Sequence, residues 1–366
     1  MTVYAWLVVL VLLAALLMHG NVKGNKKYIF VAFLLLFCVM GLRDAYSVGN
    51  DAATSYLHGF QRMEDTPWSE LSGRGEEDFN IGFSYLMKLG YVLTEGDYQL
   101  FTVIISAFMM IAFAHFVKKY SPSPVQSVLY FLGLLFYSFM FNALKQAIAM
   151  SILMFAFDAI VDKKPGKFII LTIIAAQFHY PAFVFLPAYW IGRMNVKRGY
   201  LFVLAIILLI TYLLRDDLLK LMLDAYGNEE IEATMEGITF LRNKAIIMIV
   251  IVVAALILRP ISDDDVVYSM LLKLVGVSIV FQTFCGYNNI FERLADYYFQ
   301  FSIVFIPLVF EKCDLKKMYF NPKTDRMVKS MATAVFCAFA IWRFVSTTDA
   351  DPNMSHYIFF FQSTIQ

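Results

Sequence analysis

Long apolar runs separated by short polar stretches recur along the whole chain. Each run predicts a membrane-spanning helix, because roughly 20 apolar residues cross a bilayer core. The predicted spans are 3–18, 28–42, 98–117, 123–141, 143–161, 168–179, 181–192, 199–214, 244–259, 268–286, 295–311 and 329–346. The short runs 168–179 and 181–192 form either a hairpin of two helices or one long helix kinked at Pro181. The pattern predicts an all-α polytopic membrane protein of about 12 helices, with residues 1–366 as a single transmembrane domain.

Composition agrees with this fold class. The 366 residues are 60% hydrophobic and 16% charged, whereas soluble domains are roughly 25% charged. A net charge of +1 gives no reason to expect a nucleic-acid partner. The four cysteines lack the spacing of a metal site or a disulfide framework, and the five histidines do not cluster. We therefore predict neither a bound metal nor a cofactor.

Basic residues between the spans predict the orientation. With 168–192 as a hairpin, all of the following fall on one side, which the positive-inside rule makes cytoplasmic: Lys23, Lys26, Lys27, Lys118, Lys119, Lys163, Lys164, Lys167, Arg193, Lys197, Arg198, Lys312, Lys316, Lys317, Lys323, Arg326 and Lys329. Both termini and the loops 43–97 and 215–243 then face outward. The apolar stretch 80–94 is interrupted by Gly82, Lys88 and Gly90, and we interpret it as an interfacial or re-entrant helix of the first outer loop.

The stretch around Asn142 marks a boundary between two helices. One apolar run ends there and another begins, so Lys145 and Gln146 fall in the first turn of the second helix. Unpaired N–H groups and the helix dipole favour negative charge at that end. A lysine there suits a site that binds an anion. The alternative is a lysine whose ammonium reaches the lipid headgroups and anchors the helix.

Four cations oppose the positive-inside trend, since Arg43, Lys145, Arg242 and Arg293 all fall on the predicted outer side. A shared diphosphate ligand would explain them, because arginine offers bidentate contacts to phosphate and lysine a point charge. The alternative is pairing within the protein, of Arg43 with Asp44 and of Arg293 with Glu292 or Asp296.

Other candidate groups come from an apolar turn and from the first outer loop. His179 lies in an otherwise apolar run, where an ionisable side chain is a functional candidate, or it donates to a backbone carbonyl freed by the following proline. The outer loop combines carboxylates such as Asp51 and Glu77 with aromatic residues such as Tyr56. Carboxylates bind sugar hydroxyls or act as general bases, and aromatic rings stack on apolar sugar faces.

Four short motifs, in order, resemble the EpsG-like branch of the bacterial Wzy-type polysaccharide polymerases. They are Gly41-Leu42-Arg43 followed by Val48-Gly49-Asn50-Asp51 and Tyr56, then Asn142-Ala143-Leu144-Lys145-Gln146-Ala147-Ile148-Ala149, Phe178-His179-Tyr180-Pro181-Ala182, and Glu292-Arg293 through Tyr298. The family usually has arginine where this chain has Lys145, which keeps the charge but loses the bidentate fork. The stretch from Glu77 to Phe83 matches the family's Glu-containing segment only loosely.

The resemblance implies a metal-independent glycosyltransferase with a GT-C-like helical fold. Such an enzyme would transfer a glycan from undecaprenyl diphosphate to a lipid-linked repeat unit at the outer face of the cytoplasmic membrane. Arg293, Arg43 and Lys145 would stabilise the departing diphosphate, and His179 would act as base, with Asp51 or Glu77 as rivals. The substrate-binding candidates are Asn142, Gln146, Arg242, Tyr56, Glu77, Glu292 and Tyr298.

Two other functions and a related reaction stay open at this point. A membrane O-acyltransferase would need a cytoplasmic route for acyl-CoA, and a lipid-oligosaccharide flippase would need a cationic cavity reachable from both faces. A ligase would use the same diphosphate chemistry with another acceptor. Binding of a chain-length regulator as a further partner also stays open.

Overall fold

Helices account for nearly all of the regular structure. The computed structural model describes residues 2–18, 22–49, 52–72, 80–194, 206–207, 209–210, 213–214, 217, 243–258, 265–282, 290–313 and 322–363. Within these ranges the one extended pairing is an isolated bridge between Arg43 and Phe359. The chain divides into two compact units, one formed by 1–183 with 329–366 and the other by 184–328. The all-α prediction is confirmed for the described residues.

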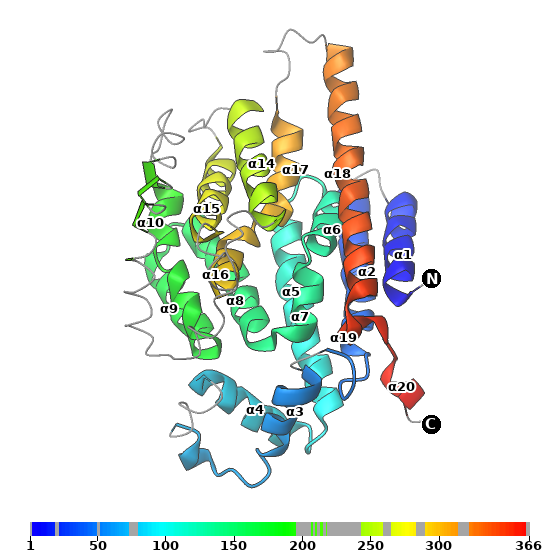
Figure 1. Ribbon diagram of the computed structural model, residues 1–366, viewed down its shortest axis with the longest axis vertical. Helices are drawn as coiled ribbons and strands as arrows, with labels where there is room; N and C mark the ends of the chain where they lie inside the picture. The colour runs from blue at the N-terminus through cyan, green and yellow to red at the C-terminus, as the bar shows by residue number, and fades with distance from the viewer. Residues whose placement is uncertain are drawn as a thin grey trace. The chain divides into compact units, whose positions relative to one another are not determined.

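The first unit contains the amino-terminal helices and most of the last long helix. Its elements are α1 (Val3–Met18), α2 (Val22–Gly41), a π-helical segment (Ala52–Tyr56), α3 (Leu57–Gln61), a 3-10 turn (Trp68–Glu70), α4 (Ile81–Leu93), α5 (Tyr98–Tyr120), α6 (Pro124–Gly133), α7 (Phe136–Asn142), α8 (Leu144–Val161), α9 (Pro165–Phe178), α18 (Pro322–Ala350, of which 329–350 belong here), α19 (Pro352–Ser355) and α20 (Phe360–Ser363) (Figure 1). The second unit contains α10 (Ala188–Arg193), α14 (Asn243–Leu258), α15 (Val266–Gln282), α16 (Ile290–Phe299) and α17 (Ser302–Lys312). A 3-10 helix, Tyr180–Phe185, crosses from one unit to the other.

Three of the described helices are long and apolar enough to cross a membrane, and the number rises to 5 if each of two bent helix pairs is one span. The three are α5, α8 and α18. Shorter apolar helices occur at Val3–Met18, Ile81–Leu93, Pro165–Phe178, Ile246–Leu256 and Val266–Gln282. They correspond to the predicted runs that begin at residues 3, 168, 244 and 268 and to the outer-loop segment 80–94. The predicted run 199–214 lies largely outside the described residues.

One predicted span, 123–141, is wrong as a single helix. It forms α6 and α7, which are bent by 48° relative to each other. The chain turns at Leu135, which has a φ of 68° in the left-handed region. A Cβ on Gly133 would lie 2.5 Å from Cα of Ala340 on α18, so the two backbones meet at the break. Arg343 of α18 donates from Nη1 to the freed carbonyl of Gly133 at 2.6 Å, which stabilises the carboxyl end of α6.

A second predicted span, 295–311, is also broken. It begins earlier, as α16, and continues as α17 after a bend of 49°. The region 168–192 likewise is not one helix kinked at Pro181, because α9 ends at Phe178 and α10 begins at Ala188, after the intervening 3-10 segment. Apolar periodicity alone does not register these breaks, because the residues on both sides remain apolar.

The predicted outer-loop helix is confirmed as α4, although its place at a membrane interface stays a prediction. Its buried Lys88 donates from Nζ to the Met63 carbonyl at 2.6 Å and so links α4 to the segment after α3. The ring of Phe60 lies 4.9 Å from that of Phe101 and 5.3 Å from that of Tyr98, between centroids. These ring contacts attach α3 to the start of α5, and the Lys88 hydrogen bond adds α4, at the lower end of the first unit in Figure 1.

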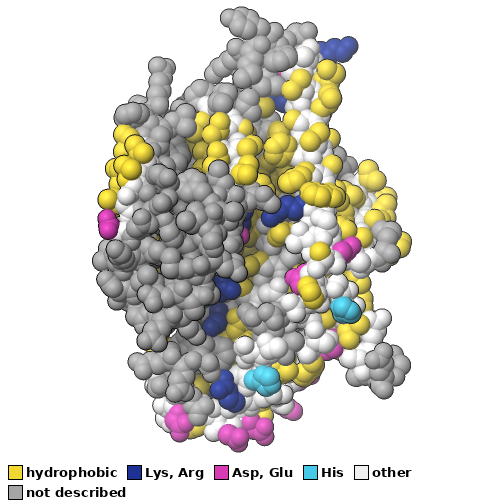
Figure 2. Space-filling view, in the orientation of Figure 1, with side chains coloured by type: hydrophobic (Ala, Val, Ile, Leu, Met, Phe, Trp, Pro, Cys, Tyr) yellow, Lys and Arg dark blue, Asp and Glu magenta, His cyan; other side chains and the backbone are white. Residues whose placement is uncertain are grey.

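The sides and the end of the first unit differ in polarity. The residues Met331, Val335, Phe339 and Trp342 of α18 are exposed and recur every three or four positions, as on one face of a helix. Figure 2 shows apolar side chains along this helix, whereas acidic side chains gather at the lower end. An exposed apolar helix face of this kind fits contact with lipid tails.

Candidate functional site

The predicted helix boundary at Asn142 is confirmed. Helix α7 ends at Asn142 and α8 begins at Leu144, with Ala143 between them at φ −104° and ψ 63°. Lys145 is therefore the second residue of α8, where the dipole and the unpaired N–H groups favour an anion. Gln146 follows it and is buried, at 2% exposure.

Lys145 is half-buried and lies beside an aromatic ring from the π-helical segment between α2 and α3. Its Nζ is 6.0 Å from the ring centroid of Tyr56, within the range of a cation–π contact. The Tyr56 ring in turn packs edge-on to Phe83 of α4, with centroids 5.4 Å apart. The structure therefore brings two of the sequence candidates, Lys145 and Tyr56, together at the amino end of α8.

Arg43 follows the end of α2 and is the largest polar side chain fully buried among the described residues, at 1% exposure. Its Nη1 donates to the Met40 carbonyl at 3.0 Å, and its guanidinium carbon lies 4.6 Å from the Phe141 ring centroid. Within the described residues its Nε has no hydrogen-bond partner. The guanidinium lies next to the α7–α8 boundary, because Phe141 is the penultimate residue of α7.

The predicted pairing of Arg43 with Asp44 is not found in the described structure. Asp44 instead accepts hydrogen bonds from the Ser47 hydroxyl at 2.6 Å and from the Tyr46 N–H at 3.2 Å. Burial lowers the pKa of the Arg43 guanidinium below its ordinary value, and the surrounding tyrosines oppose that shift. Since arginine stays protonated in proteins, Arg43 is a buried positive charge among aromatic rings.

The rings around Arg43 come from distant parts of the chain. The tyrosines whose electrostatic influence reaches the guanidinium are Tyr98, Tyr4, Tyr137 and Tyr357. The carboxy-terminal segment closes over this region, since the N–H of Asp44 donates to the Ile358 carbonyl at 3.0 Å and that of Phe360 to the Leu42 carbonyl at 3.1 Å. Tyr357 donates its hydroxyl to the Val39 carbonyl at 2.7 Å.

His179 lies at the same end of the first unit. Helix α9 follows α8 after a three-residue turn and packs against it, so the carboxyl end of α9 returns to the amino end of α8. His179 is half-buried, caps α9 with its N–H on the Ala175 carbonyl, and accepts from the Ala182 N–H. A Cβ on Gly82 would lie 2.5 Å from Cβ of Gln177, so α4 approaches α9 just before His179. The turn predicted at His179 is confirmed.

In the second unit, α16 carries the late candidates Glu292, Arg293 and Tyr298. Arg293 is exposed, and Tyr298 is buried and donates its hydroxyl to the Val184 carbonyl at 2.7 Å. Glu292 and Asp296, one helical turn apart, both pair with Lys244 of α14. Lys244 does not stand out in the sequence, although the spacing of the two acids on one helix face indicates that they can share a partner.

Three candidates, Asp51, Glu77 and Arg242, lie outside the described residues. Among the residues that are described, no group of three or more His, Cys, Asp or Glu side chains is placed to hold a metal ion. The described candidates fall into two sets. Arg43, Asn142, Lys145, Gln146, Tyr56 and His179 belong to the first unit, and Glu292, Arg293 and Tyr298 to the second.

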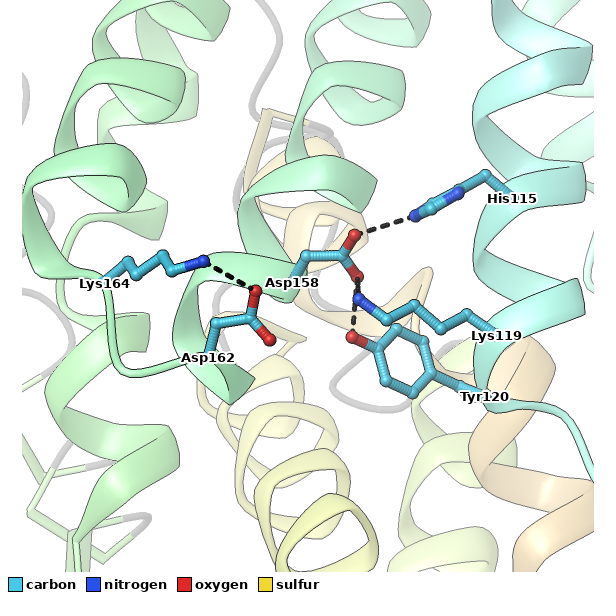
Figure 3. A network of polar contacts seen from close by, with 6 residues as sticks. All are labelled: His115, Lys119, Tyr120, Asp158, Asp162 and Lys164. Atoms are coloured by element: carbon cyan, nitrogen blue, oxygen red, sulfur yellow. Dashed lines mark hydrogen bonds and ion pairs between the residues drawn. The ribbon is translucent and has the colours of Figure 1, made fainter.

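A polar network that the sequence pattern does not predict lies at the carboxyl ends of α5 and α8 (Figure 3). Asp158 accepts from the Tyr120 hydroxyl at 2.6 Å, contacts His115 Nε2 at 2.8 Å, and pairs with Lys119 Nζ at 3.0 Å. The donors come from successive turns of α5, and their i, i+4, i+5 spacing directs them toward α8. Three partners for one carboxylate indicate a structural link between two helices.

The described residues have the helices of a membrane protein, and Lys145 and Arg293 lie in the first turns of α8 and α16, where the helix dipole favours negative charge. The chain belongs to the EpsG family, whose sequence model matches residues 26–361. The family indicates a polysaccharide polymerase-type glycosyltransferase. No curated protein matches the chain. No solved structure matches it either.

Proposed function

We propose that this protein polymerises a surface polysaccharide by transferring the growing glycan from undecaprenyl diphosphate to a lipid-linked repeat unit. The observation that carries the proposal is the family match over nearly the whole chain, residues 26–361. The buried charge of Arg43 supports it, because a guanidinium removed from water is costly unless it meets an anion. The match also favours a polymerase over an acyltransferase or a flippase.

The reaction replaces a glycosyl–diphosphate bond with a glycosidic bond. The bond between the anomeric carbon and the diphosphate oxygen breaks, and an acceptor sugar oxygen bonds to the same carbon. Negative charge develops on the departing diphosphate, where positive side chains lower the barrier. Arg43, Lys145 and Arg293 supply that charge in this proposal, so neither a nucleotide nor a metal ion is required.

The acceptor hydroxyl loses a proton as its oxygen bonds to the anomeric carbon. His179 is our first choice for the base, because an imidazole accepts a proton near neutral pH and this one is half-buried at the turn after α9. Asp51 and Glu77 are the rivals. Asn142, Gln146, Tyr56, Glu292, Tyr298 and Arg242 would contact the sugars or the lipid diphosphate.

The reaction would take place at the outer face of the cytoplasmic membrane. The asymmetry of the basic loops supports this orientation, with both termini outside and α4 at the membrane interface. The exposed residues Tyr85, Leu89, Val92 and Leu93 of α4 recur at positions i, i+4, i+7 and i+8, as expected of a helix that rests on a leaflet.

The deciding experiment uses purified protein in detergent with a lipid-diphosphate repeat unit, a chelator and no nucleotide sugar. A ladder of regularly spaced products on a gel is the expected result. Unchanged substrate, with folded protein shown to bind it, would favour a flippase or a ligase that lacks its acceptor. Transfer of an acyl group from acyl-CoA to the glycan would instead identify an acyltransferase.

Arg293 is tested in the same assay. We expect Arg293→Ala to abolish chain extension while the protein level in membranes persists, because the side chain is exposed and contributes little to packing. Polymer of normal length from this variant would remove Arg293 from the mechanism.

A further inference from the structure

We infer that the hydroxyl of Tyr4 binds the same phosphate group as Arg43, an inference that rests on the proposed role of Arg43 in diphosphate binding. Tyr4 is the second residue of α1 and is buried, at 1% exposure. Within the described residues its hydroxyl has no hydrogen-bond partner, and neither has Arg43 Nε. Two buried side chains of the first unit therefore each carry a polar group that can still bind a ligand.

Helices α1 and α2 form a hairpin that places Tyr4 next to Arg43. Helix α1 ends at Met18, α2 begins at Val22, and the two pack against each other, so the start of α1 lies beside the end of α2. Both side chains pack against one ring, since the Phe141 centroid lies 6.3 Å from that of Tyr4 and 4.6 Å from the Arg43 guanidinium carbon. Among charged groups, Arg43 has the strongest electrostatic influence on Tyr4.

The other tyrosines that surround Arg43 differ from Tyr4 in their hydrogen bonds. Tyr137 and Tyr357 donate their hydroxyls to backbone carbonyls of α2, at 2.8 and 2.7 Å. Tyr98 bonds to a threonine one turn further along α5. Their hydroxyls hold the local fold together. The hydroxyl of Tyr4 has no such partner in the described structure, and a buried hydroxyl left unpaired destabilises a protein.

A phosphate group meets the needs of both unpaired donors. The Nε of Arg43 and the hydroxyl of Tyr4 each offer a hydrogen, and phosphate oxygens accept strong, charge-assisted hydrogen bonds. The carboxylates that act on Tyr4 are Asp349 and Asp351, and both act more weakly than Arg43. Asp349 is exposed, and Asp351 accepts from the Asn353 N–H at 2.9 Å as the cap of α19. The two acids therefore leave the unpaired donors to a ligand.

The carboxy-terminal segment covers this site. Tyr357 packs edge-on to Tyr4, with centroids 5.7 Å apart, and Phe359 pairs with Arg43 in the isolated bridge. A phosphate group reaches the two donors when these contacts open. Once the segment has closed again, water is excluded and the hydrogen bonds to the phosphate are stronger than in solvent.

The test measures equilibrium binding of radiolabelled undecaprenyl diphosphate to the full-length protein in detergent. For Tyr4→Phe we expect the Kd to rise by about tenfold, because a hydrogen bond to a charged phosphate is lost while the ring stays. Thermal stability without ligand should not fall, since the hydroxyl gives up no partner within the protein.

Inorganic diphosphate serves as a competitor in the same assay. Its inhibition constant should rise in Tyr4→Phe by the same factor as the Kd of the lipid, because both carry the phosphate groups that Tyr4 contacts. If the Kd of the lipid rises and the inhibition constant of inorganic diphosphate does not, Tyr4 contacts the polyprenyl chain and the inference is wrong.

Tyr137→Phe is the matched control. Tyr137 is also a buried tyrosine beside Arg43, but its hydroxyl already has a carbonyl acceptor. Its removal should lower thermal stability and leave the Kd within about twofold of wild type, because no contact to the ligand is lost. An equal rise of the Kd in Tyr137→Phe and Tyr4→Phe would assign both effects to loosened packing around Arg43 and overturn the inference.

Two further outcomes separate the inference from the proposed function. Undecaprenyl diphosphate carries no sugar, so its binding is measured without turnover. If Arg43→Met loses binding but Tyr4→Phe binds like wild type, the role of Tyr4 is wrong and the role of Arg43 stands. If Arg43→Met binds the lipid as tightly as wild type, the proposed role of Arg43 fails and the inference fails with it.

Discussion

The charged side chains at the two ends of α8 have different surroundings. At the carboxyl end, Asp158 has three partners within 3.0 Å. About 20 Å away along the helix, at 1.5 Å per residue, the amino end carries Lys145 beside an aromatic ring. The buried Arg43 near that end makes one hydrogen bond, to a backbone carbonyl, and one contact with the Phe141 ring in the described structure.

This difference distinguishes a charged side chain that joins two helices from one that is suited to binding a ligand. A carboxylate surrounded by donors joins two helices and has little capacity left for another partner. A buried guanidinium held by one carbonyl and an aromatic face retains donors for an anion. Polar residues at both ends are equally unusual in a membrane helix, so the composition of the helix alone does not distinguish them.

Replacing Arg43 should have the largest effect on activity. For Arg43→Met we expect chain extension to fall by at least about 100-fold, because a donor to the departing diphosphate is lost. The free energy of unfolding should change by no more than about 1 kcal/mol, since relief of guanidinium desolvation offsets the lost hydrogen bond to Met40. Product gels and thermal unfolding measure the two quantities. A variant that is unstable but active when folded would make Arg43 a structural residue.

A smaller effect is expected at Lys145. Lys145→Ala should reduce extension roughly tenfold, mainly through a higher donor KM, because a point charge at the helix end is removed. Lys145→Arg should equal or exceed the wild type, since arginine adds a bidentate contact to phosphate. Steady-state kinetics with varied donor concentration measure the donor KM of both variants. Full activity of the alanine variant would support the alternative that this lysine anchors the helix at the headgroups.

The contact between Lys145 and Tyr56 should contribute less to activity than the charge of Lys145 itself. A cation–π interaction is worth about 0.5–2 kcal/mol, so Tyr56→Ala is expected to lower activity by a few-fold. Tyr56→Phe keeps the ring and should remain near wild type, which makes it the matched control. If both variants lose activity equally, the Tyr56 hydroxyl matters instead, as expected of a group that binds sugar.

The smallest effect on activity is expected at the other end of α8. Asp158→Ala should lower the free energy of unfolding by about 2–4 kcal/mol, because three donors lose a shared buried acceptor. Extension per folded molecule should stay within about twofold, since the network lies far from Lys145. Thermal unfolding and activity normalised to folded protein give both values. Strong loss of extension at normal stability would contradict the contrast between the two ends.

The sequence by itself determined the helical, membrane-embedded character of the chain and the positions of most helices. Apolar runs predict helices because the transfer of each side chain out of water is a local property. The predicted run 143–161 became α8, and the predicted run 3–18 became α1. The boundary at Asn142 was also visible, because Asn142, Lys145 and Gln146 interrupt an apolar stretch. The ordered motifs led to the family that the sequence model matches.

Only the tertiary structure decided where the chain bends and which charges meet. Leu135 is as apolar as its neighbours but adopts the left-handed conformation, and two residues before it Gly133 meets Ala340, more than 200 residues later in the chain. The partners of Asp158 and of Lys244 are separated from them by about 40 residues or more. A hydropathy pattern records the environment that each residue prefers. A hydrogen bond or ion pair depends on two distant residues reaching contact distance, which only packing of the helices provides.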